Sequence, residues 1–217
     1  MFKVKMLILS SLLLPKLSFA TVGGPQNIEV LGYESKEQKV YLLRHYQDGR
    51  GRLPQLYYYQ FKNNPHPEKI IQVNSLYINP KTQKIDYDQP STQFNKDLQK
   101  IKKRLQPLLA LPKQNIQIRI MSKKVSKEKS WYDSEQYIAK YSYKYQLKSQ
   151  NFNSKIYRAV AYRNGLTLSQ AYKIPHQQKK LAIVRYLGIP FETGYTVEDP
   201  VLLHLPSPKK IKPLKRL

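Results

Sequence analysis

The chain has no cysteine among its 217 residues. This absence excludes disulfide bonds, a lipid anchor attached through a cysteine, and a thiol nucleophile. The fold must therefore be held by its hydrophobic core, and about 200 residues suffice for such a core in one domain or in two small ones. Long apolar runs are also absent after the first twenty residues, so the sequence predicts no transmembrane segment there.

Acidic residues are scarce. The 14 Asp and Glu residues face 38 Lys and Arg residues, which gives a net charge of +24 at pH 7. A field of this sign attracts anions and speeds their encounter with the protein. Acidic or phosphorylated envelope polymers, anionic lipid head groups and extracellular DNA are therefore the candidate partners. A lysine-rich proteome, in which all exported proteins are basic, would explain the charge without any binding role.

Motifs that carry chemistry are missing as well. The chain has no GxSxG sequence and no phosphate-binding loop, and its four histidines do not have the spacing of metal ligands. Two carboxylate pairs, Asp86 with Asp88 and Glu198 with Asp199, are typical of turns and caps, although such pairs also serve in acid–base catalysis. We therefore expect a non-enzymatic protein without catalytic residues, metal or cofactor. An enzyme whose site is assembled from distant residues stays open.

The first twenty residues, MFKVKMLILSSLLLPKLSFA, have the order of a secretory signal peptide. Lys3 and Lys5 form the basic start, residues 6–14 the apolar run, and residues 18–20 the cleavage site. An uncleaved N-terminal anchor is the alternative, but the apolar run is about half of the roughly 20 residues that a membrane span needs. We expect a mature protein that begins near Thr21 and is exported to the periplasm or the medium.

The first half of the mature chain has the pattern of an antiparallel meander followed by a helix. Strands are expected at 27–33, 39–46, 53–61, 69–78 and 84–87, with turns at Asp48-Gly49 and Asn79-Pro80. An apolar residue then recurs every three or four positions, which predicts an amphipathic helix near 91–106. The residues of that stripe are Phe94, Leu98, Ile101, Leu105 and Leu108. A domain boundary near 88–91 is compatible with this change of pattern.

The middle of the chain alternates again. We expect a strand at 115–121, a charged loop at 122–130, and a long hairpin formed by 135–148 and 152–163. One face of the first hairpin strand carries tyrosines, and the other carries lysines and polar residues. The tyrosines would either pack against the 91–106 helix or form an exposed stacking platform for nucleic acids or sugars. The register of the hairpin, which decides whether Ala159 and Ala161 face Tyr143 and Tyr141, stays open.

Residues 166–189, LTLSQAYKIPHQQKKLAIVRYLGI, resemble a helix-turn-helix motif. Ala171, Leu181 and Val184 lie where that motif has its small and apolar core residues, whereas Pro175 stands where its turn glycine is expected. The pattern is also typical of two short helices that meet at Pro175. We expect such a helical pair without sequence-specific reading of DNA, because a signal peptide argues against a gene regulator.

The C-terminal stretch, residues 206–217, holds three prolines and five basic residues without an acid. Proline spacing and charge repulsion predict a disordered basic tail, which would either hold an anionic surface or be a frayed end. Anion binding is expected at this tail and on the basic residues of the hairpin. The candidate residues are Lys140, Lys144, Lys148, Arg158, Arg163, Lys209, Lys210, Lys212, Lys215 and Arg216.

Together these patterns predict an α+β fold over residues 21–205. It would consist of an antiparallel β-meander and a long β-hairpin packed with one amphipathic helix and a short C-terminal helical pair. The expected function is that of an exported, non-enzymatic protein that binds an anionic envelope component through its basic surface. The alternatives are a structural adaptor for a protein partner and, in third place, a hydrolase that acts on envelope material. Binding through charge would weaken steeply with salt, whereas an adaptor's binding need not.

Overall fold

The computed structural model of the protein describes residues 23–191 and 194–206. In this part of the chain 51% of residues are in strands and 10% are helical. The strands are β1 (Gln26–Glu34), β2 (Lys39–Tyr46), β3 (Gln55–Gln60), β4 (Ile71–Gln72), β5 (Leu109–Ala110), β6 (Gln117–Lys129), β7 (Tyr137–Ser149), β8 (Phe152–Ser154), β9 (Tyr157–Ala161), β10 (Thr167–Lys173), β11 (Lys179–Ile189) and β12 (Tyr195–His204). One α-helix, α1 (Ser91–Lys102), and two 3₁₀ helices, η1 (Ser75–Tyr77) and η2 (Lys113–Asn115), complete the described elements. None of the described helices is long and apolar enough to cross a membrane.

All twelve described strands belong to one mixed sheet. Its main path has the order β4-β3-β2-β1-β12-β11-β10-β5, and β6, β7 and β9 join it through β8, which pairs with both β12 and β7. Strands β1, β2 and β3 confirm the first part of the expected antiparallel meander, with its turn at Asp48 and Gly49. The rest is wrong: of the expected strand at 69–78 residues 71–72 form β4 and residues 75–77 form η1, and the expected strand at 84–87 is reduced to one bridge between Ile85 and Ile78. The parallel pair of β1 and β12 joins the two ends of the described chain, and the sequence offered no local signal for it.

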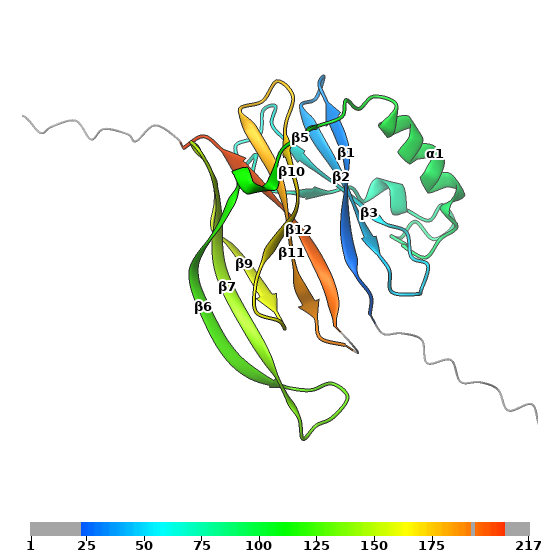
Figure 1. Ribbon diagram of the computed structural model, residues 1–217. Helices are drawn as coiled ribbons and strands as arrows, with labels where there is room; N and C mark the ends of the chain where they lie inside the picture. The colour runs from blue at the N-terminus through cyan, green and yellow to red at the C-terminus, as the bar shows by residue number, and fades with distance from the viewer. Residues whose placement is uncertain (1–22, 192–193, 207–217) are drawn as a thin grey trace, which may run out of the picture.

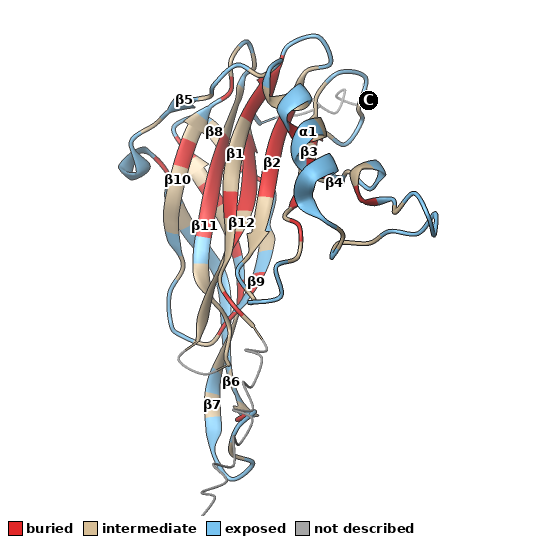
Figure 2. Ribbon diagram, turned by 90° about the vertical axis from the view of Figure 1, so that its right-hand side faces the viewer, coloured by how far each residue is buried: buried red, intermediate tan, exposed pale blue. Residues whose placement is uncertain are grey.

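The sheet folds over itself into layers. From left to right, Figure 1 shows β6, β7 and β9, then β10 to β12, then β1 to β3, and finally α1. Each neighbouring pair of layers encloses one buried cluster. In Figure 2 the buried residues follow β2, β11 and β12, whereas the lower part of β6 and β7 is largely exposed.

Helix α1 forms where its apolar stripe predicted it. Phe94 and Leu98 are buried against Tyr41, Leu43 and the other members of the cluster that α1 shares with β2 and β3. The tyrosines of β7 do not contact this helix. Instead, β7 and β9 pack on β11 and β12, in a cluster that includes Ile116, Tyr143, Tyr145, Leu147, Ala159, Ala161, Ala182, Val184, Val201 and Leu203. The expectation that the tyrosines pack on the 91–106 helix is therefore wrong.

The expectation of a C-terminal helical pair is also wrong, and so is the α+β class that included it. Residues 166–189 form the antiparallel hairpin of β10 and β11, with Pro175 in its turn. Leu181, Ala182, Ile183 and Val184 are all fully buried, since the two faces of β11 belong to two different clusters. A strand covered on both faces needs no alternation of apolar and polar residues. Its apolar run is therefore also compatible with a buried helix, which is what the pattern predicted.

Residues 122–130 were expected as a loop, but residues 122–129 belong to the 13-residue strand β6, which pairs with β7 along its length. We call β6, β7 and the turn between them, residues 117–149, the arm. Its tip is closed by a hydrogen bond from the Ser130 amide to the Gln136 carbonyl, 2.9 Å. Trp131 at the tip packs edge-on against Phe191 beyond β11, with ring centroids 5.3 Å apart. The arm is thus attached to the body at its base and at its tip.

Candidate binding surface and cavity

The outer face of the arm and β9 carries a group of basic side chains that we call the basic face. The register places Lys144 between Ser122 and Arg158, and Lys124 beside Ser142. Because alternate residues of a strand point to the same side, Lys148 and Arg119 share this face, while Tyr143 and Tyr145 point inward. The basic face consists of Arg119, Lys124, Lys144, Lys148 and Arg158.

Carboxylates are nearly missing from this face. Glu128 is the one acidic residue on the described strands β6, β7, β8 and β9, and it is 2.7 Å from the Lys140 ammonium. Their hydrogen bond lowers the pKa of the Glu128 carboxyl and raises that of the Lys140 ammonium. Lys140 is therefore already paired, whereas Lys124, Lys144 and Arg158 have no ion pair among the described residues.

A hollow of about 500 Å³ lies in the middle of the basic face. Lys124, Lys144 and Arg158 line it together with the hydroxyl-bearing Ser122 and Ser142. Ammonium, guanidinium and hydroxyl groups are the donors that hold phosphate, sulfate and carboxylate oxygens. The hollow thus has the chemistry of an anion site and contains no group that repels an anion.

The structure brings some of the sequence-predicted site residues together on one face and places others elsewhere. Lys144 and Lys148 lie on one face as the alternation implied, and Lys140 shares that face but is engaged by Glu128. Arg158 joins this face through the register of β7 with β9, which the sequence left open. Arg163 lies in the bend after β9 and is exposed. The tail residues Lys209, Lys210, Lys212, Lys215 and Arg216 lie outside the described residues, as does the predicted signal peptide. Lys124 was missed because it was expected in a loop, and Arg119 because the pairing of its strand with β7 was not predicted.

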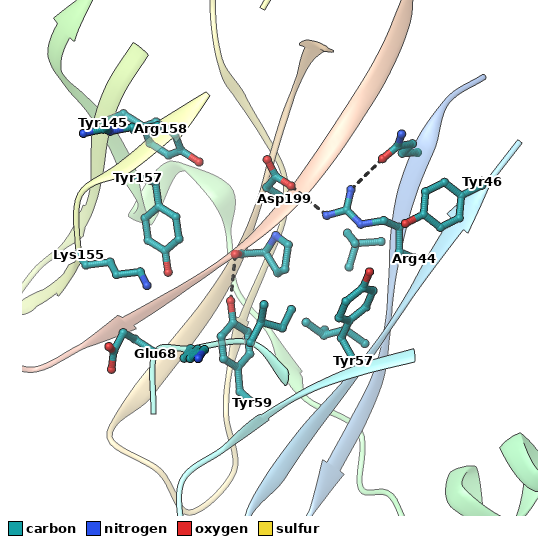
Figure 3. A pocket seen from close by; sticks show the side chains of 16 residues that line it. Arg44, Tyr46, Tyr57, Tyr59, Glu68, Tyr145, Lys155, Tyr157, Arg158 and Asp199 are labelled. Carbon is teal, nitrogen blue, oxygen red and sulfur yellow. Dashed lines mark hydrogen bonds and ion pairs between the residues drawn. The ribbon is translucent and has the colours of Figure 1, made fainter. Parts of the chain in front are cut away.

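A cavity of about 620 Å³ lies beside the basic face, where β1, β2 and β3 meet β9 and β12 (Figure 3). Arg158 lines both the cavity and the hollow. Arg44 is held within the cavity by Asp199 at 2.9 Å and by the Gln26 side chain at 3.2 Å. Asp199 also accepts a hydrogen bond from the Tyr186 hydroxyl, 2.5 Å. The carboxylate is therefore used in positioning Arg44.

Tyrosines make up much of the cavity wall. Burial raises the pKa of Tyr57 and Tyr157 to about 12, and raises that of Tyr59 and Tyr145 well above the ordinary value. Tyrosine hydroxyls with raised pKa values are protonated at neutral pH and can donate hydrogen bonds. Tyr59 donates to the Pro200 carbonyl, 3.0 Å. The Tyr157 hydroxyl lies close to Tyr59 and to the backbone of Leu202, yet it makes no hydrogen bond of good geometry.

The two carboxylate pairs have structural roles. Asp86 accepts hydrogen bonds from the Asp88 amide and the Asn79 side chain, as expected for a turn residue. Glu198 is not a turn or cap residue: it lies inside β12 and is 1% exposed. It accepts hydrogen bonds from the Ile28 amide at 2.8 Å and from Arg185, and so links β1 to β11 and β12.

Residues 23–191 and 194–206 contain no cluster of three or more side chains that could ligate a metal ion. Of the histidines, His45 binds Glu29 at 2.9 Å and His66 lies 3.9 Å from Glu68. His176 is in the turn between β10 and β11, and His204 ends β12. No protein-family model, curated protein or solved structure matches the chain.

Proposed function

We propose that this is an exported, non-enzymatic protein that binds an anionic polymer of the cell envelope along the basic face of its arm. The observation that carries the proposal is the position of five basic side chains on one face of three paired strands, where Glu128 is the one acid and is already paired. Export rests on the predicted signal peptide. The basic tail would add cations to the same interaction.

The geometry favours an extended ligand over a single small anion. Residues on one face of a strand repeat about every 6.6 Å, and neighbouring strands lie about 4.8 Å apart. The basic face therefore spaces its cations at intervals comparable to those between charged groups along a phosphorylated or carboxylated polymer. Serines between the cations supply further hydrogen-bond donors.

We favour recognition over hydrolysis as the role of the cavity. A hydrolase needs a base or nucleophile that is free to react. Two carboxylates line the cavity: Asp199 is engaged by Arg44 and Tyr186, and Glu68 lies 3.9 Å from His66. Arg158 lines both the cavity and the hollow of the basic face. One end group of the bound polymer would therefore reach the cavity while the rest follows the basic face.

The test is retention of the mature protein on immobilised lipopolysaccharide, acidic glycan and single-stranded DNA over a series of salt concentrations. The variant carries Lys124→Glu, Lys144→Glu and Arg158→Glu. Its matched control carries Lys81→Glu, Lys96→Glu and Lys103→Glu, three exposed lysines in the 79–85 turn and around α1 that change the net charge equally. We expect the first variant to lose at least about tenfold in affinity and the control to lose much less, with a steep salt dependence in the unaltered protein.

A shortened chain without residues 206–217 measures the contribution of the tail in the same assay. Equal losses in the two triple variants would mean that net charge alone drives retention, and the basic face would not be the site. Retention that ignores salt would also overturn the proposal.

One observation favours the adaptor as a second candidate function. Strand β6 pairs with β7 alone, so 13 residues of its other edge have no strand beside them in the described chain. An exposed edge can accept a strand from a protein partner. Lysines at positions 123, 124, 127 and 129 are, however, the residues that proteins use to prevent such pairing. A protein captured at high salt and lost after a proline is placed in β6 (Ser126→Pro) would favour the adaptor.

A further inference from the structure

A second cavity, of about 590 Å³, lies around the turn between β10 and β11. Three lysines line it: Lys173 at the end of β10, and Lys179 and Lys180 at the start of β11. Phe152 of β8 and Leu111 supply apolar surface, and the remaining lining residues are Asn115, Gln150, His176, Gln177 and Gln178. No Asp or Glu is among the residues that line this cavity.

The register brings two of these lysines together. Lys173 and Lys180 are directly opposite each other on neighbouring strands, so their side chains leave the sheet on the same face. Like charges in that position destabilise a sheet. None of the three lysines has an ion pair among the described residues. The fold therefore maintains a local excess of positive charge that no carboxylate of the cavity offsets.

The lysines are also held in position. The Lys180 ammonium donates to the Ser149 hydroxyl at 2.9 Å and lies 4.5 Å from the centre of the Phe152 ring. Lys179, the preceding residue of β11, points to the other face of the sheet, where its ammonium lies 5.0 Å from the ring centre of Phe61. Burial lowers the pKa of Lys179, and burial together with the charge of Lys173 lowers that of Lys180. An anion bound beside Lys180 would offset both the cost of burying its ammonium and the repulsion from Lys173.

We propose that this cavity binds a phosphate monoester, with the phosphate oxygens on Lys173 and Lys180 and an apolar substituent against Phe152 and Leu111. A dianion matches two neighbouring ammonium groups better than a carboxylate does, and ammonium–phosphate hydrogen bonds are among the stronger ones in proteins. The apolar wall adds a preference for an organic ester over inorganic phosphate. This site is separate from the basic face of the arm and does not depend on the proposed function.

The experiment is isothermal titration calorimetry of the full mature chain at 150 mM salt, with phenyl phosphate, inorganic phosphate and benzoate as probes. The test variant is Lys173→Gln with Lys180→Gln. The matched control is Lys127→Gln with Lys129→Gln, which removes the same charge from the far part of the arm. We expect phenyl phosphate to bind more tightly than the other two probes, and the test variant to weaken it by about tenfold or more while the control leaves it unchanged.

Thermal unfolding of the free proteins supplies a readout that is independent of the probe. Because the like-charged pair is removed, the test variant should unfold at the same temperature as the unaltered chain or above it. Phenyl phosphate binding that is equal in both variants, or that is undetectable at millimolar concentration in the folded unaltered chain, would overturn the proposal. Benzoate binding as tightly as phenyl phosphate would overturn the assignment to a phosphate.

Discussion

The arm contains a base whose inner side chains are buried and a distal part whose side chains are exposed. Its base, residues 117–119 and 143–149, carries Tyr143, Tyr145 and Leu147, which are 4%, 0% and 0% exposed. Its distal part, residues 121–140, carries Tyr137 on the same strand and the same face as these residues, yet Tyr137 is 58% exposed. The difference lies in the body beneath: β11 and β12 cover the inner face of the base and do not extend under most of the distal part.

This contrast shows what a tyrosine-rich alternation can and cannot indicate. It predicts a strand with one aromatic face, because tyrosine suits a pleated surface. Whether that face is core or surface depends on a second layer that comes from residues 181–184 and 201–203. The base therefore stabilises the fold, and the distal part presents side chains to solvent. The predictions below test this division.

The largest effect is expected from Tyr145→Ala in the base. Removing a fully buried ring leaves a cavity in the cluster shared with β11 and β12, which should lower the free energy of unfolding by about 3–5 kcal/mol. Tyr137→Ala in the distal part should change it by less than about 0.5 kcal/mol. Urea unfolding followed by circular dichroism measures both values. Similar losses in the two variants would show that the division between base and distal part is wrong.

Alkaline pH should act through the buried tyrosines. Burial raises the pKa of Tyr57 and Tyr157 to about 12, while tyrosines in the unfolded chain lose their proton near 10. Above pH 10 the unfolded state therefore binds fewer protons than the folded state, and the free energy of unfolding falls as pH rises. We expect a loss of about 1–3 kcal/mol between pH 10 and pH 12, with stability from these groups fully present below pH 10.

The control for this pH dependence is Tyr157→Phe, which keeps the ring and removes the titrating hydroxyl. Its stability should decline less steeply between pH 10 and pH 12 than that of the unaltered chain. Removal of the Tyr137 hydroxyl in the distal part, by Tyr137→Phe, should leave the slope unchanged. A common slope for all three proteins would assign the alkaline loss to other groups.

Much of the fold near the N-terminus could be predicted, because its signals are local. Asp48 and Gly49 define a turn, and Phe94 and Leu98 define a helix face. The failures have one physical cause: the deciding contacts are distant in sequence. The run from Leu181 to Val184 is a strand because two separate clusters cover its two faces. Residues 122–129 form a strand because β7 pairs with them, although Val125 is their one apolar side chain.

The residues of the candidate site could also be predicted only in part. Lys144 and Lys148 could be assigned to one face from alternation. Arg158 joins them through the pairing of β9 with β7, whose register the sequence left open. Arg119 and Lys124 join them only through the pairing of β6 with β7. The cavity was beyond prediction, since it draws Arg44, Tyr157 and Asp199 from strands that are more than 40 residues apart in the chain. A site built from one strand is visible in a sequence, whereas a site between layers is not.

The smallest predicted effect concerns the tip, which is the second attachment of the distal arm. Trp131 is the single tryptophan of the chain, so tryptophan fluorescence reports on the tip of the arm. Phe191→Ala removes the ring that packs on Trp131, and should shift the emission to longer wavelength and increase quenching by acrylamide. An aromatic pair contributes about 0.5–1.5 kcal/mol, so global stability should fall by about that amount at most. Hydrogen exchange should accelerate at residues 122–128 and stay unchanged at residues 143–149, where burial against β11 and β12 does not depend on the tip.

Tyr132→Ala is the matched control, because it removes the other neighbour of Trp131 and leaves the contact with Phe191 in place. An unchanged spectrum in Phe191→Ala, or acceleration that extends into the base, would mean that the arm is held as one unit and not at two separate points.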